Sequence, residues 1–83
     1  MASVKDILAQ SDAIIKICQA AFDRAHREGG VWENYVSSDL TRAGYSARFE
    51  DIDYNDISLI AVIHADDGKV SVRIKDDGTW ILA

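Results

Sequence analysis

The sequence predicts an α+β domain in which a long N-terminal helix and a second, shorter helix pack on one face of a four-stranded antiparallel meander (ααββββ). Apolar residues recur at steps of three and four between Val4 and Ala25, which is typical of an amphipathic helix. The second half of the chain is richer in β-branched residues, and Asp67-Gly68 and Asp77-Gly78 have the composition of hairpin turns. Because 83 residues have room for one hydrophobic core, we expect a single domain over residues 1–83.

The first helix is expected over residues 3–28. Ser3-Val4-Lys5-Asp6 has the spacing of a capping box, and Gly29-Gly30 can end the helix in the left-handed conformation. A helix of this length measures about 39 Å, whereas a strand of eight residues covers only about 27 Å. The helix therefore either overhangs the sheet or breaks, with Ser11-Asp12 as the cap of a second segment.

The second helix is expected over residues 31–43, because its apolar residues share one face at helical spacing and Gly44 follows as a stop. A shorter helix that begins at Ser37-Ser38-Asp39 is the alternative.

Four strands follow, expected over residues 46–53, 57–65, 70–75 and 79–82. A change of parity in the first strand indicates a bulge near Glu50 and Asp51. The almost wholly apolar second strand is typical of the centre of a sheet. If the last strand lies at the sheet edge, its unpaired backbone groups are open to strand addition.

The two Asp-Gly turns, taken as two-residue loops, predict which side chains share a face of the sheet. The helix side is expected to carry Ile57, Leu59, Ala61, Ile63, Val70, Val72, Ile74 and Ile81. The outer side is expected to carry Ser58, Ile60, Val62, His64, Ser71, Arg73, Lys75, Trp80 and Leu82.

Large apolar side chains on an outer sheet face often mark an interaction surface, and Trp and Arg are enriched at binding hot spots. The alternative is that the second helix or the segment 45–54 covers this face. The residues expected to bind a partner are Ile60, Val62, Arg73, Lys75, Trp80 and Leu82. Among them Trp80 is the expected anchor, so W80A should weaken binding more than it changes the fold.

Acidic residues predominate, with 14 Asp and Glu against nine Lys and Arg and a net charge of −5. This balance argues against direct binding to nucleic acid, which needs a basic surface. In a meander the first and third turns meet at one end of the sheet, where an acidic rim is expected from Glu50, Asp51, Asp53, Asp56, Asp76 and Asp77. Such a rim suits a basic or nucleic-acid-binding protein and would imitate DNA phosphates, unless these residues serve turn formation and solubility alone.

No catalytic, metal or cofactor site is expected. The run 51–62 begins like an EF-hand loop but has Asp56 in place of the turn glycine and Val62 in place of the bidentate glutamate. His64 has Ser and Asp neighbours but no oxyanion-hole motif. Cys18 falls on the apolar stripe of the first helix and is expected to be a small core residue.

The single cysteine fits a reducing compartment. No run of about 20 apolar residues is present for a membrane span, and the first residues do not form a secretory signal. We therefore expect a cytoplasmic protein, in the host cytoplasm if the gene belongs to a phage or another mobile element.

These observations favour a small acidic, non-enzymatic module that inhibits another protein by occupying its surface. Anti-defence proteins such as anti-CRISPR proteins, immunity proteins and DNA mimics are inhibitors of this class. The alternative is a homodimeric structural or regulatory domain whose outer sheet face is the subunit interface. A small enzyme or ligand carrier would instead show a pocket with converging polar groups.

Overall fold

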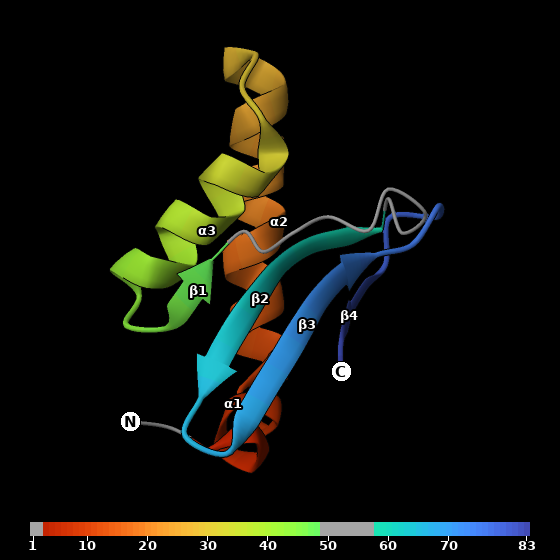
Figure 1. Ribbon diagram of the computed structural model, residues 1–83. Coiled ribbons are helices and arrows are strands. Elements are labelled where there is room, and N and C mark those ends of the chain that lie inside the picture. Colours follow the sequence, from red (N-terminus) through yellow and green to blue (C-terminus); the bar gives the residue numbers. More distant parts are fainter. Residues whose placement is uncertain (1–2, 49–57) are drawn as a thin grey trace.

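A computed structural model describes residues 3–48 and 58–83 of the chain. The elements are α1 (Val4–Ala9), α2 (Ser11–Glu28), α3 (Trp32–Arg42), β1 (Ser46–Arg48), β2 (Leu59–Ala65), β3 (Gly68–Ile74) and β4 (Trp80–Leu82). The strands form one antiparallel sheet in the order β1-β2-β3-β4, and the helices pack on it (Figure 1). The predicted α+β architecture is confirmed.

The expected first helix is broken at Gln10, so it becomes α1 and α2. Gln10 has φ −101° and ψ 18°, and the Ser11 hydroxyl donates to the carbonyl oxygen of Leu8. The predicted capping box is present at the start of α1, where the Asp6 N–H donates to Ser3 Oγ at 3.2 Å. The break is one of the two expected alternatives, but the N-cap residue of α2 is Gln10, and no side chain caps this helix as was expected of Ser11 and Asp12.

The second helix forms as α3 without a break at its serines. The end of α2 also follows the prediction, since Gly29 adopts φ +75° and its N–H donates to the carbonyl oxygen of Ala25 at 2.8 Å. A side chain is poorly tolerated at this φ, which explains why a glycine ends α2.

The β2–β3 turn also holds the start of α1. Its turn residues are Asp66 and Asp67, and the Val4 N–H donates to Asp67 Oδ1 at 2.8 Å. The sequence placed this turn at Asp67-Gly68. Consequently Ile63 lies opposite Val70. The expected turn would have placed Ile63 opposite Val72, two residues further along β3. A shift by two residues leaves every side chain on its predicted face.

Asp67→Ala should lower the free energy of unfolding by about 1 kcal/mol, because it removes an acceptor from the first turn of a helix. Urea denaturation followed by circular dichroism would measure the loss. Asp66→Ala is the matched control, since it removes the same charge from the same turn without touching the bond to Val4. Equal losses in the two variants would contradict this role of Asp67.

The β3–β4 pairing differs from the expected one by a single residue. Ile74 lies opposite Trp80, and Arg73 lies opposite Ile81. The connection is a longer loop over residues 75–79, in which the Lys75 N–H donates to the carbonyl oxygen of Thr79 at 2.8 Å. A one-residue shift moves every side chain of the strand to the other face, so the prediction that Trp80 and Leu82 face outward and Ile81 inward is wrong.

A second irregularity, in β2, moves Ile60 into the core. The register shifts between Leu59 and Ala61, which leaves Ile60 as the extra residue of a bulge. Its side chain is only 1% exposed, so its predicted outer position is also wrong. Leu59 lies opposite Arg73 on the outer side, so its predicted position on the helix side is wrong as well. The predicted first-strand bulge at Glu50 and Asp51 lies outside the described residues.

The core lies between α1, α2 and α3 on one side and the sheet on the other. Its buried members are Ile7, Ile14, Cys18, Ala21, Val36, Leu40, Ile60, Ala61, Ile63, Val70, Val72 and Trp80. Leu82 packs against this cluster and is half-buried.

Candidate binding surface

The residues predicted to bind a partner do not share one surface. Ile60, Trp80 and Leu82 belong to the helix side of the sheet, as the register requires. Val62 lies on the outer side but is only 5% exposed. Of the remaining two, Arg73 is half-buried and Lys75 is exposed.

The outer sheet face is largely polar where an apolar one was expected. Its strands present the side chains of Ser46, Arg48, His64, Lys69, Ser71 and Arg73, together with three apolar residues, Leu59, Val62 and Ile81. A polar face opposite the core face is typical of an antiparallel sheet covered on one side. The argument for a partner on this face is weakened, because the expected anchor Trp80 lies on the helix side together with Ile60 and Leu82.

The predicted acidic rim is described only in part. Asp76 and Asp77 lie exposed in the β3–β4 loop, whereas Glu50, Asp51, Asp53 and Asp56 lie outside the described residues. Hydrogen bonds from Thr79, whose N–H lies 2.9 Å from Asp77 Oδ1, hold the pKa of the Asp77 carboxyl below its ordinary value. This carboxylate thus stays charged at neutral pH while it also shapes the loop.

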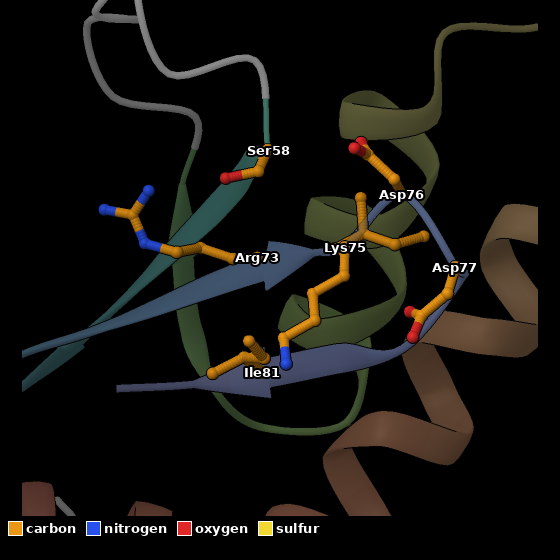
Figure 2. A pocket seen from close by; sticks show the side chains of 7 residues that line it. Ser58, Arg73, Lys75, Asp76, Asp77 and Ile81 are labelled. Carbon is orange, nitrogen blue, oxygen red and sulfur yellow. The ribbon is translucent and has the colours of Figure 1, made fainter.

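Two hollows flank this loop. The first, of about 450 Å³, lies beside Arg73 and Ile81 and is shown in Figure 2. There the Lys75 side chain extends toward Ile81, away from the carboxylate of Asp76 (Figure 2). The second hollow, of about 470 Å³, is lined by Phe22 and Trp32 from the helices and by Ser58, Ile74, Lys75, Asp76, Asp77 and Gly78. The β3–β4 loop therefore lies between two hollows. The second of them is lined by residues from both the helices and the sheet.

Phe22 and Trp32, which line the second hollow from the helices, belong to a larger aromatic cluster. It consists of Phe22 and His26 from α2, Trp32 from α3 and Trp80 from β4. The Phe22 ring lies 4.5 Å from His26, 4.8 Å from Trp32 and 5.8 Å from Trp80, centroid to centroid. His26 stacks on Trp32 at 5.5 Å with an interplanar angle of 18°. Rings from α2, α3 and β4 thus all lie against Phe22. These contacts hold the four side chains in fixed positions relative to one another.

Trp32 is the exposed member of the cluster. It is 40% exposed, and its neighbour Val31 is 57% exposed. Trp80, in contrast, is 6% exposed, and its Nε1–H donates to Gln19 Oε1 at 2.9 Å. The sequence predicted that Trp80 is exposed and Trp32 buried. The structure shows the reverse, because Trp80 packs in the core and Trp32 lies at the surface.

The junction of α2 and α3 sets the position of Trp32. Arg24 Nη2 donates to Asp39 Oδ1 at 2.8 Å, and the Arg24 guanidinium carbon lies 5.0 Å from the centroid of the Tyr35 ring. A Cβ atom on Gly30 would lie 2.0 Å from a carbon of the Tyr35 ring, so the glycine is needed for this close approach. These contacts fix the direction of α3, which begins at Trp32.

Sequence reasoning missed Trp32 because its helical spacing assigned it to the buried stripe of the second helix. The available signal was its place directly after Gly29-Gly30. A residue in the first turn of a helix next to an interhelical corner can lie beyond the edge of the core.

The other candidate groups among the described residues are the Cys18 thiol and the potential metal ligands. Cys18 is buried in the core, and burial raises the pKa of its thiol to about 12, so the reactive thiolate is suppressed. Within residues 3–48 and 58–83, no three His, Cys, Asp or Glu side chains gather in a way that could hold a metal ion. Over the same ranges, no helix has the length and apolar character needed to cross a membrane.

Comparison with known proteins gives no relative from which a function could be transferred. No protein family matches the chain, and no curated protein or solved structure matches it significantly.

Proposed function

We propose that this protein is a small non-enzymatic binding module that inhibits another protein by occupying its surface. Its contact surface is the aromatic surface formed by Phe22, His26, Val31 and Trp32 beside the β3–β4 loop. The observation that carries the proposal is the exposure of Trp32 and Val31 next to a hollow of about 470 Å³. Exposed apolar surface of this kind often marks an interaction site, and tryptophan is the residue type most enriched at hot spots.

The support of Trp32 from beneath favours the same proposal. Its ring stacks on His26 and packs on Phe22, so it already has a defined orientation in the free protein. A side chain that is ordered in advance loses little conformational entropy on binding. Trp32 therefore suits the role of an anchor better than an unsupported surface side chain would.

The polar outer sheet face does not suit the homodimeric alternative in the form predicted from the sequence. A self-interface there would bring Arg48, Lys69 and Arg73 of both copies together, and like charges at an interface cost binding energy. The specific inhibitor classes named from the sequence, including anti-defence proteins and DNA mimics, stay predictions.

The proposal is tested by comparing partner capture by the wild type, Trp32→Ala and Leu8→Ala. Leu8 is a 38% exposed apolar residue on α1 and serves as the control. From a lysate of the cell that encodes the protein, we expect one stoichiometric partner with the wild type and Leu8→Ala, and its loss with Trp32→Ala. Capture that survives Trp32→Ala would contradict the assigned surface.

The oligomeric state separates the two classes of function. Light scattering after size-exclusion chromatography should give a monomer for the wild type and for Trp32→Ala. A wild-type dimer that Trp32→Ala converts to a folded monomer would show that the aromatic surface is a self-interface, and would overturn the inhibitor proposal.

A further inference from the structure

We propose that the hollow between Trp32 and the β3–β4 loop binds an arginine side chain of the partner protein. This inference rests on the proposed function and specifies the chemistry of its contact. It follows from the two walls of the hollow, which differ in character. Phe22 and Trp32 form one wall, and the loop residues Asp76 and Asp77 form part of the other.

The aromatic wall suits the flat face of a guanidinium. Trp is the best of the aromatic side chains for cation–π contact, and arginine stacks on rings more often than lysine does. Trp32 is 40% exposed although His26 and Phe22 pack against it. Part of Trp32 is thus open to an incoming group, and this residue lines the hollow.

The loop wall supplies the complementary charge. Asp76 and Asp77 are both exposed, and a carboxylate accepts the paired N–H donors of a guanidinium in bidentate geometry. One Asp77 oxygen already accepts from the Thr79 N–H at 2.9 Å, which fixes the direction of that carboxylate. An arginine between the walls would stack on one and form hydrogen bonds with the other, whereas a lysine ammonium would achieve only the charge contact.

One ammonium group, that of Lys75, is among the lining residues and reduces the negative charge of the hollow. Lys75 lines it, but its side chain extends toward Ile81 and hence toward the first hollow (Figure 2). His26 contacts Trp32 from α2, and its Nδ1 lies 3.1 Å from the carbonyl oxygen of Phe22. The two carboxylates outnumber the one ammonium among the lining residues. With a net charge of −5 on the whole chain, the electrostatic attraction is for a cation.

The test uses an acetylated and amidated peptide of alternating glycine and arginine, with lysine, glutamine and glutamate versions as comparisons. Two-dimensional ¹H–¹⁵N spectra report separately on the indole N–H groups of Trp32 and Trp80, assigned with Trp32→Phe. The arginine peptide is added up to about 10 mM, a concentration range that covers weak single-residue contacts. Over this range it should shift the Trp32 signal until the shift saturates. The Trp80 signal should stay in place.

Asp76→Asn should weaken binding of the arginine peptide about fivefold, in the range for an exposed ion pair. Asp66→Asn removes the same charge from the β2–β3 turn, at the opposite end of β3 (Figure 1), and should leave the affinity unchanged. Equal shifts with the arginine and glutamine peptides, no shift up to the highest concentration, or equal effects of the two variants would each overturn the inference.

Failure of this inference and failure of the proposed function give different results. If the partner is lost with Trp32→Ala but captured by Asp76→Asn as strongly as by the wild type, the aromatic surface binds a partner by another chemistry. If neither variant affects capture, the assigned surface itself is wrong.

Discussion

Replacing Trp80 with alanine should lower the free energy of unfolding by about 3–5 kcal/mol, the cost typical of truncating a buried aromatic side chain. The Trp80 ring is 6% exposed and meets Phe22 edge-on at 5.8 Å. Its Nε1–H donates to Gln19 Oε1 at 2.9 Å, so the substitution also removes a hydrogen bond between β4 and α2. A single domain has about 5–15 kcal/mol of stability in total. Trp80→Ala should therefore lose a large part of this stability, and denaturant titration followed by circular dichroism would measure the loss.

Ile81→Ala is the matched control for this prediction. Ile81 lies next to Trp80 in β4 but on the outer face, where it is half-buried. We expect it to cost about 1 kcal/mol or less. The register expected from the sequence would place Ile81 in the core and Trp80 outside it. The larger loss of stability would then occur in Ile81→Ala. A larger loss in Ile81→Ala than in Trp80→Ala would therefore contradict the β3–β4 pairing.

The helices could be predicted because their signals are local. The capping box at Ser3 and Asp6 and the glycine at position 29 act through bonds within a few residues, and the structure contains both. Apolar spacing likewise identified the faces of α2 and α3, since it reports on one helix at a time. The order of the strands followed from short connections, which leave few topologies open.

The β3–β4 register could not be predicted because loop length decides it. Asp77-Gly78 was treated as a complete two-residue turn, but it lies inside a loop that begins at Lys75 and ends at Thr79. Hydrogen bonds within this loop compete with the shorter turn, and composition alone does not show which prevails. Because side chains alternate along a strand, this single misplaced residue exchanged the faces of Trp80 and Ile81.

The candidate surface could not be predicted because it combines distant parts of the chain. Phe22, Trp32 and Asp77 come from α2, α3 and the β3–β4 loop, and no pattern in the sequence links them. Their meeting depends on the corner at Gly30 and on the ion pair between Arg24 and Asp39. Lys75 and the carboxylates of the β3–β4 loop were identified in advance, the former as a partner-binding residue and the latter as part of the acidic rim.

Ile60→Ala should lower the free energy of unfolding by about 2–4 kcal/mol, because it leaves a cavity among side chains that cannot fully close around it. Ile60 is the extra residue of the bulge in β2 and is 1% exposed within the core cluster. In a regular strand it would point outward and alanine would be tolerated. The loss of stability in Ile60→Ala thus reports directly on the bulge. Urea denaturation of the wild type and the variant would measure it, provided that the unfolding free energy of both falls with urea concentration at the same slope.

Leu8→Ala provides the comparison for Ile60→Ala, since it removes an equally large part of an aliphatic side chain at a site that is 38% exposed. We expect that variant to lose about 0.5 kcal/mol, as at other surface positions. A loss for Ile60→Ala no greater than for Leu8→Ala would mean that β2 pairs regularly with β3. The outer face would then carry Ile60 in place of Leu59, next to Val62. Because the bulge decides which of these two residues lies in the core, this pair of variants tests the register of β2 directly.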